Sequence, residues 1–440
     1  MTGWRSDHGA MWRLALPTIL ANLTQPLLGI VDTAVIGNLS AAHIGAVAAG
    51  ATVFAFLYWA LAFLRMATTG FAAQAYGAGD HDEVGAAMTR AAVLAAVFGI
   101  AILALQRPIV DLAIVLISPS AEVETLTREY TLIRIWGAPA ALANMAILGW
   151  LLGLQRAGTA LALQIVINGV NIVLDLVLAV WLDMEVAGVA WATMVAQYAG
   201  LAAGLWVVLR VARGMDIHWR LSTLRDGARL VAVTRVNRDI FVRTLCVITA
   251  VAMFTAQGAR MGDLVLAANG ILVLFQMFLS HGLDGFAHAA EALVGNAVGA
   301  RDRRALRVAV RVSTIWAALV AIGYTALYSL AGWWLVGLIT DLPDVRAAVG
   351  QYFFWIILSP LISVWSFQLD GIFIGATGAR QMRNAMLLAF AVYLIALPLL
   401  LPAWGNHGLW LAFMLFMVAR AVTLAAYYPS LERTVTSARG

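Results

Sequence analysis

The chain lacks lysine altogether, and it has a single cysteine among its 440 residues. All 28 basic residues are therefore arginines, whose charge is permanent at any accessible pH. The lone Cys246 lies in an apolar run, which indicates a small buried residue and excludes both a disulfide framework and a CxxC-type metal or redox site within the chain.

Charged residues and catalytic motifs are also scarce. Asp, Glu and Arg together make up only 12% of the chain. We find no Walker A loop, no HExxH zinc motif and no GxSxG elbow in the sequence. These absences argue against an ATP-driven pump and against an intramembrane enzyme. We accordingly predict a protein that is not an enzyme and has no cofactor.

Hydrophobic residues make up 62% of the chain, far above the average for soluble proteins. Apolar runs of about 20 residues, the length that crosses a bilayer as a helix, recur along the whole sequence. The start, MTGWRSDHGAMWR, lacks the small-residue cleavage site of a signal peptide. The pattern predicts an all-α polytopic membrane protein whose partner is the lipid bilayer, and it gives no support to nucleic-acid binding.

Twelve spans are predicted, at 11–37, 44–73, 84–105, 125–153, 160–181, 187–209, 238–260, 264–297, 305–331, 347–374, 381–402 and 407–428. Arginines crowd the segment 210–237 and the loop at 301–304, whereas the loops 38–43, 182–186 and 403–406 contain none. By the positive-inside rule, both termini are expected in the cytoplasm.

The sequence repeats itself at an interval of about 220 residues. The segment 74–80, QAYGAGD, resembles 296–302, NAVGARD, and Pro139 has a counterpart in Pro360. Six spans per half give the two halves the same orientation, an arrangement typical of transporters. We predict two pseudo-symmetric six-helix lobes, 1–209 and 238–440, joined by a cytoplasmic linker at 210–237.

The first span holds two prolines and one acid, namely Pro17, Pro26 and Asp32. A proline inside a membrane helix removes a backbone hydrogen bond, so Pro26 is a candidate bend. A carboxylate inside a membrane helix is costly and is a functional-site candidate by default. Asp32 is therefore a candidate proton or cation site.

Span five adds Asn168, Asn171 and Asp175, whose spacing places them on one helical face, and span six adds Thr193. Counted from the outer ends of their helices, Asp32, Asp175 and Thr193 all lie roughly 8–9 Å deep. Such a cluster can hold a proton between two carboxylates or bind a hard cation through oxygen atoms. The alternative is a polar network that only joins helices.

A second polar stripe lies on span eight, and two more charged residues are placed toward the same side; the set is His281, Asp284, His288, Glu291, Asp370 and Arg65. Histidines beside carboxylates suggest a metal site, but a polar wall along a water-filled cavity explains the stripe better, so we predict no bound metal. For Arg65, the choice lies between a gate that pairs with an acid of the other half and a side chain that reaches to the membrane interface.

Five segments, in this order, resemble the multidrug and toxic compound extrusion (MATE) family, and within it the DinF-like bacterial branch. They are WRLALPTILANLTQPLLGIVDTAVIG, FLRMATTGFAAQAYGA, NIVLDLVL, LDGFAHAAEALVGNAVGARD and LDGIFIGATGARQMRNAM. The resemblance covers essentially the whole chain. It implies a secondary antiporter of the bacterial inner membrane that expels organic cations and other drugs in exchange for protons or sodium ions.

The resemblance also implies roles for individual residues. Asp32 looks like the family's first-helix aspartate, whose protonation is linked to bending at Pro26. Asn171, Asp175 and Thr193 look like its cation site, and Asp370 is similar to an acid of the NorM-like branch. That branch has a second acid in helix seven, whereas residues 242–259 here, VRTLCVITAVAMFTAQGA, contain none.

We therefore predict a monomeric antiporter that is driven by H⁺ rather than Na⁺ and exports cationic or amphipathic small molecules. The sequence by itself leaves both ions open. The alternatives are a lipid or glycolipid flippase of the same superfamily and a non-transporting membrane scaffold, although buried acids at a matched depth would be costly in a scaffold.

Overall fold

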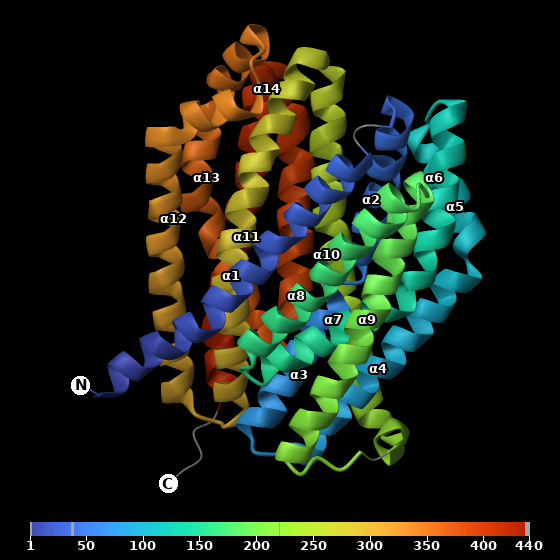
Figure 1. Ribbon diagram of the computed structural model, residues 1–440. Helices are drawn as coiled ribbons and strands as arrows, with labels where there is room; N and C mark the ends of the chain where they lie inside the picture. Colours follow the sequence, from blue (N-terminus) through green and yellow to red (C-terminus); the bar gives the residue numbers. More distant parts are fainter. Residues whose placement is uncertain (1, 37–38, 220, 436–440) are drawn as a thin grey trace. The chain divides into compact units, whose positions relative to one another are not determined.

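The computed structural model describes residues 2–36, 39–219 and 221–435, without the side chains of residues 2–6, 25–28, 30, 32–33 and 221–222. All regular structure in these ranges is helical. The first helices are α1 (Thr2–Ile36), α2 (Ala41–Ala60), α3 (Phe63–Gly77), α4 (His81–Ala104), α5 (Gln106–Ile117), α6 (Ala121–Arg134), η1 (Ile135–Gly137), α7 (Ala138–Gly153), α8 (Ala157–Leu174), η2 (Asp175–Trp181) and α9 (Glu185–Gly214). The others are η3 (Leu221–Arg225), α10 (Gly227–Arg260), α11 (Asp263–Gly299), α12 (Arg303–Ile339), α13 (Pro343–Gly375) and α14 (Ala379–Thr434) (Figure 1).

Ten helical segments within the described ranges are long and apolar enough to cross a membrane. One of them, α14, holds two predicted spans, because Gly405 breaks it with a backbone conformation of φ 54° and ψ −130°. The predicted first span lies in α1. The twelve-span, all-α fold predicted from the sequence is thereby confirmed.

The helices form two compact units. The first unit comprises residues 20–233, and the second unit comprises residues 1–19 together with 234–440. The lobe bounds 1–209 and 238–440 stay a prediction. By contacts, residues 1–19 of α1 group with the second unit. Trp12 explains this grouping, since its ring makes T-shaped contacts with Phe286 and Trp316 at centroid distances of 5.4 and 5.0 Å.

Within each unit, a corresponding pair of helices comes into backbone contact, and glycine makes this approach possible. A Cβ atom on Gly149 of α7 would lie 2.4 Å from the carbonyl oxygen of Arg65 on α3. A Cβ atom on Gly371 of α13 would lie 2.3 Å from the carbonyl oxygen of Ala287 on α11. Gly371 and Ala287 each follow their counterparts by 222 positions, so the sequence repeat is also a repeat of helix packing.

The prolines that mark the repeat behave differently in the two units. Pro139 stands at the start of α7, after the short 3₁₀ turn η1, so its span is divided into two helices. Pro360 lies inside the continuous helix α13. Close to it, the Thr325 hydroxyl donates to the carbonyl oxygen of Ile357 at 3.1 Å.

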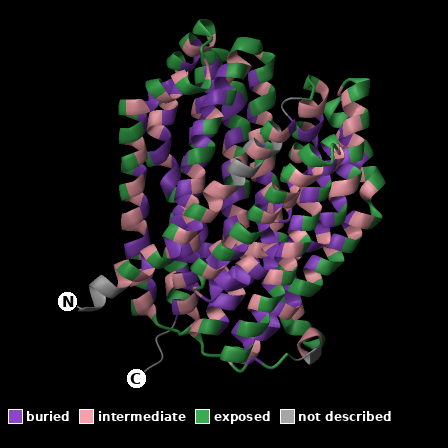
Figure 2. Ribbon diagram, viewed as in Figure 1, coloured by how far each residue is buried: buried purple, intermediate pink, exposed green. Residues whose placement is uncertain are grey.

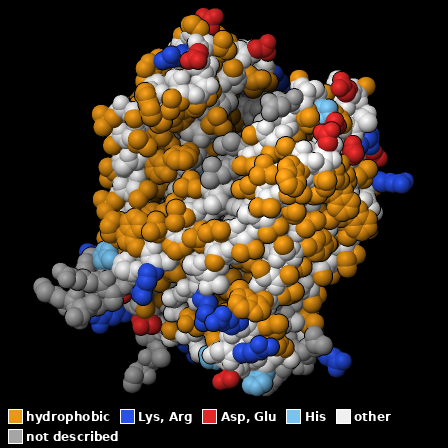
Figure 3. Space-filling model, viewed as in Figure 1, with side chains coloured by type: hydrophobic (Ala, Val, Ile, Leu, Met, Phe, Trp, Pro, Cys, Tyr) orange, Lys and Arg blue, Asp and Glu red, His pale blue; other side chains and the backbone are white. Residues whose placement is uncertain are grey.

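Burial within each unit follows the helix packing. Figure 2 shows buried residues on the faces that helices turn toward one another, for example along α12 and α13. The largest fully buried side chains include Trp150 in the first unit and Trp410 in the second. Figure 3 shows apolar side chains along the length of the helices and charged side chains mostly near their ends, as expected for a protein solvated by lipid.

Candidate functional site

The carboxylate predicted in span five lies in the interior of the first unit. Asp175 is 0% exposed, and Asn168 and Asn171 are also buried. The Asn171 amide nitrogen lies 3.4 Å from the Thr193 hydroxyl, a hydrogen bond that joins α8 to α9. Three of the predicted residues are therefore close together, since Asp175 follows Asn171 by one helical turn.

Asn168 has a different partner. Its side-chain oxygen accepts a hydrogen bond from the Gln164 amide at 2.9 Å, one turn earlier on α8. The polar face thus extends along α8 from Gln164 to Asn171, and at Asn171 it is hydrogen-bonded to α9.

A π-helix begins at Asp175, which the sequence analysis did not predict. The segment η2 runs from Asp175 to Trp181, and its end is marked by a hydrogen bond from the Leu182 amide to the Val177 carbonyl at 2.9 Å. Gly188 lets α9 approach this segment, because a Cβ atom there would lie 2.8 Å from the Cα atom of Ala179. π-Helical turns are rare and occur often at functional sites.

The predicted first-span residues lie in α1, which is helical through positions 26 and 32. The side chains of Pro26 and Asp32 lie outside the described residues. The bend at Pro26 and the role of Asp32 stay predictions.

The stripe on α11 is divided among different contacts. The Nδ1 atom of His281 lies 2.6 Å from the Met277 carbonyl oxygen, one turn earlier on the same helix. His288 Nε2 lies 4.0 Å from a carboxylate oxygen of Glu291, which is buried. Among the described residues, no three His, Cys, Asp or Glu side chains are grouped so as to hold a metal ion.

Asp370 is bound by two arginines that the sequence analysis missed. Its Oδ2 atom accepts hydrogen bonds from Arg243 of α10 and, at 2.7 Å, from Arg420 of α14. All three side chains are buried in the second unit. A signal was present in the sequence, because Arg243 and Arg420 interrupt the apolar spans 238–260 and 407–428, where a charge is costly.

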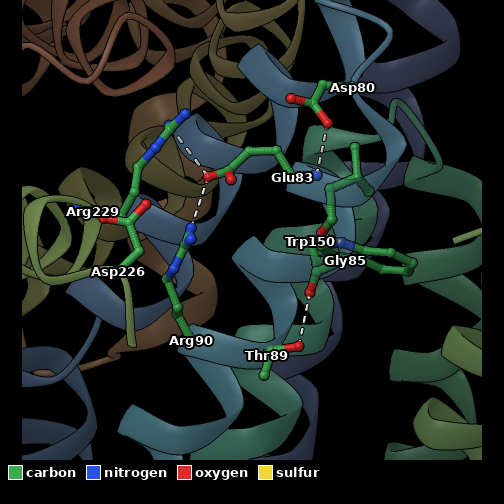
Figure 4. Close-up of polar contacts among 9 residues, drawn as sticks. Asp80, Glu83, Gly85, Thr89, Arg90, Trp150, Asp226 and Arg229 are labelled. Atoms are coloured by element: carbon green, nitrogen blue, oxygen red, sulfur yellow. Dashed lines mark hydrogen bonds and ion pairs between the residues drawn. The ribbon is translucent and has the colours of Figure 1, made fainter. Parts of the chain in front are cut away.

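The same arrangement, one carboxylate shared by two arginines, recurs in each unit. In the first, Glu83 of α4 binds Arg90 at 2.7 Å and Arg229 at 3.5 Å, and Figure 4 shows Glu83 between these two guanidinium groups. In the second, Glu432 binds Arg303 at 2.9 Å, and Arg307 also binds it. With no lysine in the chain, these bridges use the planar guanidinium group, which suits shared carboxylates.

The repeated motif itself serves as a helix cap. Asp80 accepts a hydrogen bond from the Glu83 amide at 3.0 Å at the start of α4, and Asp302 accepts one from the Ala305 amide at 2.9 Å at the start of α12. Aspartate is among the preferred residues at this position. The similarity of QAYGAGD and NAVGARD therefore has a structural cause in each unit.

Arg65 belongs to α3 of the first unit, and the acids considered as its partners belong to the second unit. Its backbone carbonyl accepts a hydrogen bond from the Thr69 hydroxyl at 2.9 Å and lies against Gly149. Pairing of its side chain with an acid of the other half stays a prediction.

These observations define an integral membrane protein of two repeated helical units with buried carboxylates in both. A model of the MatE family matches the chain twice, over residues 17–177 and 240–401, once for each half. The chain belongs to this family, the multidrug and toxic compound extrusion transporters. Its members are transporters and not enzymes, in agreement with the sequence prediction.

Individual relatives support the assignment over nearly the whole length. The chain is 41% identical to the DNA damage-inducible protein F of Escherichia coli, covering 96% of this chain and 92% of that one. It is 26% identical to a probable multidrug resistance protein NorM of Rhizobium meliloti, covering 99% and 96%. A crystal structure of MATE in the bent conformation has the same fold, with a TM-score of 0.87 at 19% identity over 99% of both chains.

Proposed function

We propose that this multi-pass transporter is a proton-driven antiporter that exports organic, cationic or amphipathic molecules. The observation that carries the proposal is the complete burial of Asp175, one turn from the Asn171–Thr193 hydrogen bond. A carboxylate kept inside an apolar helix bundle is costly unless it binds a proton or a cation during function.

Two features favour H⁺ over Na⁺. A proton needs only the carboxylate, whereas a sodium ion needs several oxygen ligands. Asn171 and Thr193 are already hydrogen-bonded to each other, and Thr193 also donates to the Val189 carbonyl oxygen at 3.0 Å. We propose that the transported proton binds to Asp32 and Asp175, which act as a coupled pair of carboxylates.

The transporter is proposed to work as a monomer in a bacterial inner membrane, with both termini in the cytoplasm. The arginine distribution supports this orientation. The names of relatives support drug export, since one of them is a probable multidrug resistance protein.

The test uses purified protein in sealed vesicles loaded with ethidium, an organic cation, under pH and sodium gradients imposed one at a time. A pH gradient alone should drive ethidium movement, and a sodium gradient alone should not. If ethidium moves under the sodium gradient and not under the pH gradient, the coupling ion is Na⁺ and the assignment of H⁺ is wrong. If neither gradient drives ethidium while a fluorescent lipid crosses the bilayer, the protein is a flippase and the proposal is wrong.

A further inference from the structure

The interior of the second unit contains two arginines that share a single acceptor. Arg243 from α10 and Arg420 from α14 both donate to the same oxygen atom of Asp370, although they are far apart in the sequence. Their side chains are 9% and 4% exposed, so both guanidinium groups are removed from bulk solvent.

These two guanidinium groups have more N–H donors than the described residues offer acceptors. A guanidinium group carries five N–H donors. The Nε atoms of Arg243 and Arg420 are buried and have no acceptor among the described residues. One further donor of Arg420 reaches only the sulfur of Met417, at 3.2 Å, which is a weak acceptor. A buried N–H donor without an acceptor costs folding free energy, so each such donor calls for an explanation.

A second shared carboxylate lies one helical turn away on α10. Asp239 accepts hydrogen bonds from Arg238 at 3.0 Å and from Arg383 of α14 at 2.8 Å. Asp239 and Arg243 are four positions apart and therefore share a face of α10. The exposed fractions fall from 61% at Arg238 and 24% at Arg383 to 9% at Arg243 and 4% at Arg420.

Carboxylates lie among these arginines as well. Besides Asp370 and Asp239, the carboxylate of Asp284 on α11 acts on Arg420. Four arginines thus stand against three aspartates. A metal cation is not expected at Asp370, because both hydrogen bonds on its Oδ2 atom come from guanidinium groups that are already cationic.

We propose that Arg243 and Arg420 form a binding site for an oxyanion, namely the carboxylate or phosphate group of an amphipathic molecule. The anion takes the guanidinium donors that Asp370 does not use, with the charge-assisted geometry that favours arginine for such groups. This inference rests on the transport function proposed above and extends its substrates to molecules that carry an anionic group. A phospholipid headgroup of the bilayer would offer the same chemistry.

The first experiment measures binding of octyl phosphate to the full-length protein in neutral detergent by calorimetry, with octyltrimethylammonium as a cation of equal chain length. The wild type should bind octyl phosphate better than the cation at this site. Arg420→Gln and Arg243→Gln should each weaken octyl phosphate by about tenfold or more, since a lost charge-assisted contact changes affinity by that factor. Arg304→Gln is the matched control, because Arg304 is exposed on the same unit.

The second variant distinguishes loss of the site from loss of folding. Asp370→Asn removes the carboxylate that competes for the donors, so it should tighten octyl phosphate several-fold. Misfolding cannot produce a gain of affinity. Equal affinities in the wild type and Arg420→Gln, or no tightening in Asp370→Asn, would overturn the proposal.

Nanodiscs identify the natural source of the anion. If a transported solute fills the site, octyl phosphate should bind equally well with and without phosphatidylglycerol in a phosphatidylcholine bilayer. If a lipid headgroup fills it, added phosphatidylglycerol should compete in the wild type but not in Arg420→Gln; either result supports an oxyanion site. All of these measurements are made without an ion gradient, and Asp175→Asn should bind octyl phosphate normally. A negative result in these binding experiments would therefore refute the oxyanion site without refuting proton-driven export. A negative result in the transport assay would likewise not refute the oxyanion site.

Discussion

At the scale of single residues, the chain keeps its carboxylates in two kinds of surroundings. Asp370 is held by two guanidinium groups, whereas Asp175 is buried beside amide and hydroxyl groups of α8 and α9. A carboxylate that is already bonded to two permanent cations is poorly suited to exchange a proton or a metal ion during each cycle. The two acids are therefore expected to do different work.

The first prediction concerns Asp32. Asp32→Asn should abolish export driven by a pH gradient, because the variant keeps the size of the side chain but cannot gain or lose a proton. Export is measured in vesicles, and folding is checked by the elution profile and thermal unfolding in detergent. Export at the wild-type rate in a folded Asp32→Asn variant would show that this residue is not the coupling group.

The second prediction concerns Asp175. If it titrates together with Asp32, Asp175→Asn should replace a two-step dependence of export on pH by a single step. The measurement is the initial export rate across a series of pH values in the wild type and the variant. Asp183→Asn serves as a control, since Asp183 is exposed in the loop after η2. Identical pH profiles in Asp175→Asn and the wild type would contradict a shared site.

At the scale of helices, close backbone contacts set the positions of the polar groups. The π-helix η2 begins at Asp175 and is covered by α9 at Gly188. The pairs α3–α7 and α11–α13 are brought together by Gly149 and Gly371 in the same way. Such contacts leave no room for even a methyl group, so they restrain the helices that carry the site.

The third prediction tests the contact at η2. Gly188→Ala should destabilise the protein by about 1–3 kcal/mol, because the new methyl group overlaps the backbone of Ala179. Gly169→Ala is the matched control, since a Cβ atom on this α8 glycine meets nothing within 4 Å and alanine favours helix by up to about 1 kcal/mol. Thermal unfolding in detergent gives both values. Equal stability of Gly188→Ala and Gly169→Ala would show that the contact between α9 and η2 can accommodate a methyl group, which would contradict the prediction.

At the scale of the whole molecule, α1 and the linker each connect the two units. Residues 1–19 of α1 pack in the second unit, and the rest of α1 continues into the first. The linker is fastened to the first unit at the start of α4, where a Cβ atom on Gly85 would lie 2.5 Å from the Ile217 side chain. The Arg229–Glu83 ion pair adds a second attachment. Helix α1 and the linker are the two places where the chain passes from one unit to the other.

The fourth prediction concerns the attachment at α4. Glu83→Gln should lower stability by about 1–3 kcal/mol, because it leaves the buried Arg90 without its acid. Arg229→Gln should cost less than about 1 kcal/mol, since Arg229 is largely exposed and its ion pair is longer. Thermal unfolding ranks the variants, with Glu122→Gln at an exposed position of α6 as the control. A larger effect for Arg229→Gln than for Glu83→Gln would contradict this ranking.

The class of fold and the positions of the membrane spans could both be predicted from the sequence. Hydropathy is a local property, and a helix in lipid must satisfy its backbone internally, so length and apolar content suffice to locate a span. The 222-residue repeat was visible for the same reason, because capping aspartates act on their own helix, as Asp80 and Asp302 do. The burial of Asp175 followed from its place inside an apolar run.

Which charged side chains meet could not be predicted from the sequence, because it depends on how distant helices pack. Arg243 and Asp370 are 127 positions apart, and no local pattern states that one carboxylate will hold two arginines from α10 and α14. The π-helix at Asp175 and the attachment of residues 1–19 to the second unit also depend on packing, through Gly188 and Trp12. Local sequence sets where a helix can form, whereas the free energy of burying a charge depends on what distant helices bring beside it.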